Sequence, residues 1–210
     1  MKRLVVKICG ITTPEDAAMA AAAGADALGL NFWPGSKRVV SVAQARRIIE
    51  AVPPFVWVVG VFVNAKVAEV QAVAQAVGLH GVQLHGDESP REASQTGRFT
   101  IKALQVRDTS VTAEVARYRD VDALLLDAAQ SGYGGGGKTF DWRLARRIAR
   151  ERPILLAGGL DPKNVGQAVK QVRPLGVDVA SGVERAPGIK DVRKVRAFIR
   201  AARAAQGELT

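Results

Sequence analysis

The sequence predicts an α/β fold, a single-domain, eight-stranded parallel (β/α)8 TIM barrel that spans residues 1–210. Short apolar runs alternate with amphipathic stretches and recur about every 20–30 residues, which is the length of one βα unit. No linker or change in composition interrupts this rhythm, and barrels of this type begin at roughly 200 residues. An open doubly wound sheet is the alternative, but its Gly-x-Gly-x-x-Gly fingerprint is missing after the first apolar run.

Eight apolar runs are expected to form the strands, because each is short, apolar and followed by turn or helix-start residues. In chain order they cover residues 5–9, 27–32, 55–62, 81–85, 100–104, 123–127, 154–157 and 177–180.

Helix-start signals follow several of these runs. Thr13 precedes a proline and two acidic residues, which is typical of a capped first turn. Ser41 with Gln44, and Ser89 with Glu92, have the spacing of a capping box. Further starts are expected at Asn64, Asp141, Asp161 and, for the last helix, about Asp191.

Composition indicates a cytoplasmic protein with no membrane partner. No stretch approaches the ~18 uninterrupted apolar residues that span a bilayer. The apolar run that follows Lys2 and Arg3 is broken by Lys7, too early for a secretion signal. Cys9 is the only cysteine, so no internal disulfide can form, which suits a reducing compartment.

The net charge of +10 leaves two interpretations open, a footprint for nucleic acid or a basic surface around a site for a small anion. The basic residues fall mostly on predicted helices, without a run of five or more. Aromatic residues make up only 5%, which provides few stacking platforms for bases. Solvated helix faces are therefore the favoured explanation, and we expect no nucleic-acid partner.

Polar residues interrupt the predicted strands at positions that share one face. Side chains alternate along a strand, so Lys7 lies on the face of Cys9, and Gln83 on that of His85. The other face must be apolar to pack against helices, so these residues are expected to point into the barrel. Burial of charge requires pairing, and we expect Lys7 and Lys102 to form an interior ion-pair cluster with Asp178.

Cys9, His85 and Asp127 each end a predicted strand. Active sites of barrels lie at the carboxyl ends of the strands, so these three are candidates for chemistry. Simpler explanations exist, since a lone buried cysteine is usually an inert hydrophobic residue and an aspartate after a strand is often a turn residue.

Three glycine-rich loops follow the last three strands. GYGGGGKTFDW, which contains Lys138, is either a phosphate cradle without the Walker spacing or a mobile lid. AGGLDP and SGVE follow the seventh and eighth strands, where many barrels bind phosphate. Glycine lets backbone N–H groups approach an anion closely, so these two loops predict a phosphate site.

The motifs KICGIT, GLNFWPGSKR, GVFVN, VQLHGDE, LLLDA, GKTFDW, LAGGL, VASGVE and PGIKD occur in this order. Together they resemble the phosphoribosylanthranilate isomerase family of tryptophan biosynthesis, nearly from end to end. The resemblance implies a cofactor-free, metal-free Amadori rearrangement of N-(5-phosphoribosyl)anthranilate to 1-(2-carboxyphenylamino)-1-deoxyribulose 5-phosphate, by general acid–base catalysis. It permits a monomer or a homodimer, and its only ligand is a small phosphorylated substrate.

The resemblance also implies roles for individual residues. Cys9 matches the family's general base, Asp127 its general acid, and Arg38 an arginine near the anthranilate carboxylate. Further substrate contacts are expected from Gln83, His85, Gly158, Gly159, Ser181 and Gly182, the last four at the phosphate.

Two questions stay open on the sequence alone. The Cys9 thiolate needs a nearby cation, which is either Arg38 or Lys7. The family usually has threonine or serine where Gly136 stands, so the hydroxyl at that position is missing; this bears on side-chain contacts from the loop but not on the acid–base pair. A sugar-phosphate epimerase is the alternative enzyme, although it commonly needs a metal cluster and the chain has only two histidines.

Overall fold

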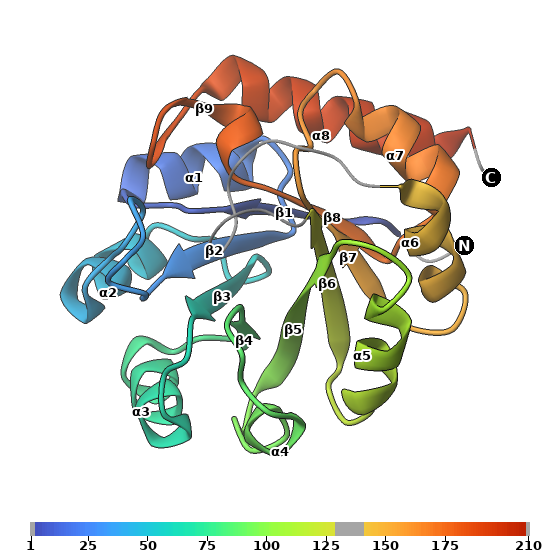
Figure 1. The fold of residues 1–210 in the computed structure, drawn as a ribbon. Coiled ribbons are helices and arrows are strands. Elements are labelled where there is room, and N and C mark those ends of the chain that lie inside the picture. The colour runs from blue at the N-terminus through green and yellow to red at the C-terminus, as the bar shows by residue number, and fades with distance from the viewer. Residues whose placement is uncertain (1–2, 129–140, 209–210) are drawn as a thin grey trace.

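The predicted barrel is confirmed. In the computed structural model, which describes residues 3–128 and 141–208, eight parallel strands close in the order β1 to β8, with helices around them (Figure 1). The strands are β1 (Val5–Cys9), β2 (Ala27–Asn31), β3 (Trp57–Phe62), β4 (Gly81–Leu84), β5 (Phe99–Val106), β6 (Ala123–Ala128), β7 (Ile154–Leu156) and β8 (Gly176–Val179).

The helices follow the strands in turn. They are α1 (Pro14–Ala22), α2 (Val42–Glu50), α3 (Val67–Val77), α4 (Pro90–Ala93), α5 (Val111–Arg117), α6 (Trp142–Ala149), α7 (Val165–Val172) and α8 (Val192–Gly207). After β8 the chain forms a short 3₁₀ turn, η1 (Ser181–Val183), and an antiparallel hairpin of β9 (Glu184–Ala186) and β10 (Ile189–Lys190). The sequence did not predict this hairpin. None of the helices in the described part of the chain has the length and apolar character needed to cross a membrane.

Most of the predicted helix starts are confirmed. Thr13 caps α1, and both capping boxes form, at Ser41 and at Ser89. Asp141 and Asp191 cap α6 and α8. Each cap satisfies backbone N–H groups of the first turn that would otherwise lack a partner.

Two predicted starts are wrong. Helix α3 begins after Lys66, and Asn64 instead adopts a left-handed conformation with φ of 53°. Helix α7 begins after Asn164, while the Asp161 carboxylate accepts the backbone N–H groups of Lys163 and Asn164. In both places the polar residue shapes the loop ahead of the helix, a local use that competes with capping.

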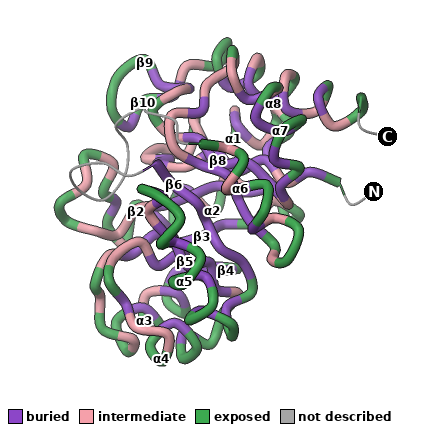
Figure 2. Tube along the Cα trace, turned by 45° about the vertical axis from the view of Figure 1, so that its right-hand side comes forward, coloured by how far each residue is buried: buried purple, intermediate pink, exposed green. Residues whose placement is uncertain are grey.

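The barrel separates two apolar cores. A larger one lies between strands and helices, and a smaller one lies inside the barrel. Figure 2 shows the buried strands surrounded by helices whose outer faces are exposed. Strand alternation explains the division, since successive side chains point to opposite faces. The interior set is Val59, Ile101, Ala103, Ala123, Leu125, Leu155 and Ala157.

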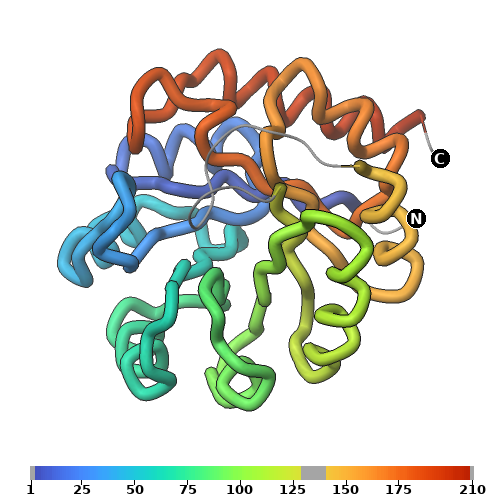
Figure 3. The backbone as a smooth tube through the Cα atoms, in the orientation of Figure 1, coloured from blue at the N-terminus to red at the C-terminus, as the bar shows by residue number. Residues whose placement is uncertain are grey.

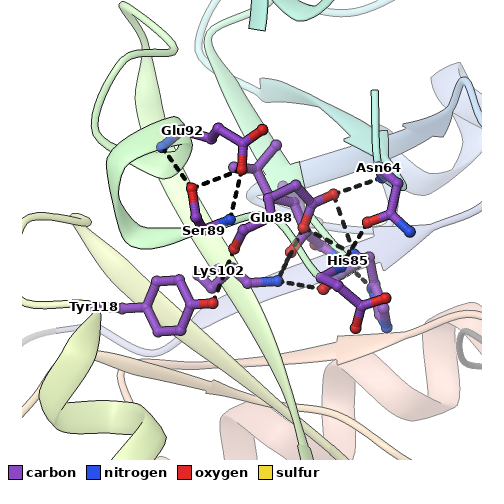
Figure 4. Close-up of polar contacts among 11 residues, drawn as sticks. Asn64, His85, Glu88, Ser89, Glu92, Lys102 and Tyr118 are labelled. Atoms are coloured by element: carbon purple, nitrogen blue, oxygen red, sulfur yellow. Dashed lines mark hydrogen bonds and ion pairs between the residues drawn. The ribbon is translucent and has the colours of Figure 1, made fainter. Parts of the chain in front are cut away.

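The prediction for Lys102 is wrong. Its neighbours Ile101 and Ala103 face the barrel interior, so Lys102 points outward, toward the helices. Its ammonium group lies 3.0 Å from the Glu88 carboxylate and donates to the carbonyl of Gly86 at 2.6 Å (Figure 4). The strand therefore buries a lysine on the face that packs against the helices, where the Glu88 carboxylate balances its charge and the Gly86 carbonyl accepts a hydrogen bond.

Glu88 organises the loop that follows β4. Its carboxylate accepts the backbone N–H groups of Asn64 and Gly86 in addition to Lys102, and its carbonyl accepts the Tyr118 hydroxyl (Figure 4). These hydrogen bonds satisfy the buried carboxylate, which would otherwise be costly to remove from water. The network thus ties the loops after β3 and β4 to β5.

The two ends of the described chain lie close together, as Figure 3 shows. Arg203 of α8 donates to the carbonyl of Leu4 and pairs with Asp26. The Asp26 carboxylate also accepts the Val6 N–H at 2.7 Å. These contacts join the last helix to the first strand and so complete the helical layer.

Replacement of the buried cation tests the importance of this network. Lys102→Met should lower the free energy of unfolding by about 3–5 kcal/mol, because it leaves the Glu88 carboxylate buried without a counter-charge. Urea denaturation measures the loss. The double variant Lys102→Met, Glu88→Gln should recover part of it, and a single variant as stable as the wild type would contradict the assignment.

Candidate active site

A cavity of about 670 Å³ opens at the carboxyl ends of the strands, within the size range of small-molecule sites. In residues 3–128 and 141–208, no group of three or more His, Cys, Asp or Glu side chains is placed to hold a metal ion. The polar side chains that line the cavity are Cys9, Arg38, Gln83, His85, Asp127, Asp178 and Glu184, among others.

Lys7 is fully buried and contacts Gln83 and Asp178, two residues that line this cavity. Its ammonium group donates to Asp178 Oδ1 at 2.8 Å and to Gln83 Oε1 at 3.0 Å, and the Cys9 thiol lies nearby. Burial opposes the charge, but Asp178 and Cys9 outweigh it and raise the pKa of Lys7 above its ordinary value. The predicted Lys7–Asp178 pair is therefore confirmed, and Lys7 stays a cation.

Cys9 ends β1 and faces the cavity. Burial raises the pKa of its thiol, while the charges of Lys7 and Lys190 oppose that rise. Of the cations near the thiol, Lys7 opposes this rise most, which favours Lys7 over Arg38 as the cation beside it. Lys190 is a second cation that the sequence did not single out.

Asp127 and His85 face each other. The Asp127 carboxylate, on β6, lies 3.5 Å from Nε2 of His85, the residue after β4. His85 Nδ1 in turn lies 2.9 Å from Gln83 Nε2. A continuous chain of polar contacts therefore runs from Asp178 through Lys7, Gln83 and His85 to Asp127.

Arg38 is held by a carboxylate that sequence reasoning missed. Its Nε and Nη2 donate to the two oxygens of Glu184 at 2.8 and 2.7 Å, a bidentate pair. This hydrogen bonding raises the pKa of the Arg38 guanidinium. Lys190, on the hairpin, approaches the same carboxylate at 2.7 Å and donates to the Cys9 carbonyl at 2.6 Å. The hairpin after β8 thus joins Arg38 to the end of β1.

The loops after β7 and β8 have the geometry of a backbone cradle. Gly158 and Gly159 have φ of 81° and 66°, in the region that side chains disfavour. The Asn164 amide fixes the loop, since it donates to the Gly159 carbonyl at 2.8 Å and accepts the Asp161 N–H at 2.9 Å.

Ser181 joins Gly158 and Gly159 in the cavity wall, whereas Gly182 does not line the cavity. It packs on the Leu160 carbonyl, where a Cβ would lie 2.0 Å from the oxygen, and so joins the two loops. The glycine loop at 134–137 and Lys138 lie outside the described residues.

Comparison with known proteins identifies the family. The sequence model of the family described as N-(5'phosphoribosyl)anthranilate (PRA) isomerase matches residues 6–201. The chain belongs to the phosphoribosylanthranilate isomerase family. An N-(5'-phosphoribosyl)anthranilate isomerase of Myxococcus xanthus is 51% identical over 202 residues, 94% of this chain and 95% of that protein.

Solved structures of family members share the fold. The phosphoribosyl anthranilate isomerase of Thermotoga maritima has a TM-score of 0.91 at 45% identity, with 96% of this chain and 99% of that chain covered. Another family structure is described as a complex with reduced 1-(o-carboxyphenylamino)-1-deoxyribulose 5-phosphate. It has a TM-score of 0.87 at 42% identity over 96% and 99% of the two chains.

The raised pKa of Cys9 predicts how its alkylation depends on pH. Because the thiolate is the reactive form, the iodoacetamide rate should rise about tenfold per unit from pH 7 to pH 9, without a plateau. Cys9 is the only cysteine, so mass spectrometry of the whole protein reports it alone. A rate that levels off between pH 6 and pH 8 would show that the thiol is ionised there and would contradict the burial effect.

Proposed function

We propose that this chain isomerises N-(5-phosphoribosyl)anthranilate to 1-(2-carboxyphenylamino)-1-deoxyribulose 5-phosphate, the Amadori step of tryptophan biosynthesis, without a metal or cofactor. The observation that carries the proposal is the placement of Cys9 and Asp127 in one cavity, on strands β1 and β6, with a glycine cradle beside them. An aldose–ketose rearrangement needs one acid and one base in such an arrangement.

Asp127 acts as the acid in the first step. Its carboxyl group gives a proton to the ribose ring oxygen as the bond from C1 to that oxygen breaks. The lone pair of the anthranilate nitrogen forms the C=N bond of the Schiff base. Asp127 leaves this step as a carboxylate, with Nε2 of the His85 imidazole 3.5 Å from it.

Cys9 acts as the base in the second step. Its thiolate removes the proton from C2 of the sugar, the C–H electrons form the C1=C2 bond, and the C=N pair returns to the nitrogen to give the enolamine. In the change to the ketone, the C2 hydroxyl gives its proton to the Asp127 carboxylate and C1 takes up the proton held by Cys9, which restores both groups. Lys7 supplies the positive charge that offsets the burial of this thiolate. Only the thiolate fraction is competent, so kcat/KM should rise with pH over the neutral range.

Arg38 and the glycine loops hold the two ends of the substrate. Glu184 occupies Nε and Nη2 of Arg38, and Nη1 makes no hydrogen bond within the described residues, which suits it to the anthranilate carboxylate. Gly158, Gly159 and Ser181 line the cavity where the phosphate would accept backbone N–H groups.

A free thiol base also suits the reducing cytoplasm, where we place the enzyme.

Removal of either proton-transfer group should abolish most activity. Cys9→Ala and Asp127→Asn should each lower kcat at least about 100-fold, the usual scale of an acid–base contribution. Loss of the fluorescence of phosphoribosylanthranilate measures turnover. Circular dichroism of both variants should match the wild type, and full activity in either one would refute its role.

Arg38→Lys should separate binding from chemistry. The variant keeps the charge but loses the planar fork, so KM should rise about 10–100-fold while kcat changes less. Steady-state kinetics with the same fluorescence assay measure both constants. A variant with lowered kcat and unchanged KM would instead place Arg38 in the chemical step.

A further inference from the structure

The geometry points to Gln83 as a positioning residue that sets the tautomer of His85 and so directs an imidazole N–H at Asp127. The tautomer follows from the contacts alone, and its catalytic use rests on the proposed function. This gives Gln83 a role different from the direct substrate contact expected from the sequence.

Lys7 determines which way the Gln83 amide points. An ammonium group only donates hydrogen bonds, so the Gln83 atom 3.0 Å from Lys7 Nζ must be the oxygen. Asp178 holds Lys7 from the other side at 2.8 Å, and both side chains are buried. The amide therefore has one orientation, with its nitrogen turned away from Lys7.

Gln83 in turn determines which nitrogen of His85 carries the proton. The amide nitrogen only donates, and it lies 2.9 Å from His85 Nδ1, so Nδ1 must accept. If Nδ1 carried a proton, two donors would face each other and the hydrogen bond between Gln83 and His85 could not form. The neutral ring consequently carries its proton on Nε2.

The Nε2–H group is aimed at the acid. Nε2 is buried and has no hydrogen-bond partner within the described residues, and Asp127 Oδ2 lies 3.5 Å away. A buried donor without a partner is costly, and catalytic hydrogen bonds of empty sites are often long. When Asp127 releases its proton, the new carboxylate attracts this N–H and the contact shortens. His85 thus stabilises Asp127 after proton transfer without acting as the acid itself.

The oxygen and the nitrogen of the Gln83 amide each contact a protein group, and only 1% of the residue is exposed. That leaves Gln83 little capacity to bind substrate directly. Its effect on the reaction should therefore pass through His85.

Nitrogen NMR of the ¹⁵N-histidine-labelled protein at neutral pH tests the tautomer directly, without turnover. The chain has two histidines, and His80→Gln assigns their signals. The backbone N–H of Val58 donates to His80 Nδ1 at 3.0 Å, so His80 is an internal standard for the same tautomer. We expect His85 to show an unprotonated Nδ1 and a protonated Nε2. A proton on Nδ1 in the wild type would overturn the inference, whatever the variants do.

Gln83→Glu is the matched perturbation. It keeps an oxygen for Lys7 but replaces the donor that faces His85 with an acceptor. The His85 Nδ1 signal should change to that of a protonated nitrogen, while the His80 signal stays the same. An unchanged His85 signal in the folded variant would contradict the control by Gln83.

Kinetics separate positioning from substrate contact. Gln83→Met, which removes both hydrogen bonds at similar volume, should lower kcat about 10–100-fold and leave KM within about twofold. His85→Gln, which can place a donor near Nε2, should retain more of kcat than His85→Asn. A raised KM at unchanged kcat in Gln83→Met would mark a substrate contact and overturn the inference.

The two proposals fail separately. A wild-type protein with the expected NMR signals but no turnover of phosphoribosylanthranilate would refute the proposed function alone. An active enzyme whose His85 carries its proton on Nδ1 would refute the positioning role alone.

Discussion

The buried ammonium group of Lys7 is the interaction on which the candidate site depends. It lies on the first strand and contacts Asp178 of the eighth, Gln83 of the fourth and the thiol of Cys9. Closure of the barrel brings these strands together, so the charge is satisfied only when the fold is complete. Lys7 therefore serves both the proposed base, through its charge, and the proposed acid, through the orientation of Gln83.

A second group of charged side chains, Arg38, Glu184 and Lys190, lies in and next to the cavity wall. Glu184 pairs with Arg38 and with Lys190, and Lys190 also reaches the backbone of Cys9. Burial opposes the charge on Glu184, but these two cations lower the pKa of its carboxyl group. The hairpin after β8 is thereby joined to the loop after β2, and Arg38 is oriented before any substrate arrives. Such preorganisation reduces the cost of binding.

Much of this site follows from strand periodicity. Alternation predicted that Lys7 and Cys9 share the interior face, and strand ends predicted the positions of His85 and Asp127. The same reasoning failed for Lys102, because its strand is apolar on both faces and the pattern cannot say which side is the interior.

Glu184 and Lys190 were missed for a different reason. They lie on an irregular hairpin, and their partner Arg38 is 146 residues from Glu184 in sequence, a contact that no local pattern encodes. The sequence around Asn64 predicts a helix start, whereas its left-handed backbone and its contact with Glu88 depend on tertiary structure.

Neutron diffraction from crystals exchanged into D₂O tests the central claim most directly, since it locates the protons around Lys7. We expect a fully charged Lys7 with deuterons that point at Asp178 and Gln83, and a Gln83 amide with one deuteron directed at His85 Nδ1. A neutral Lys7, or a Gln83 amide turned with its nitrogen toward Lys7, would contradict this claim.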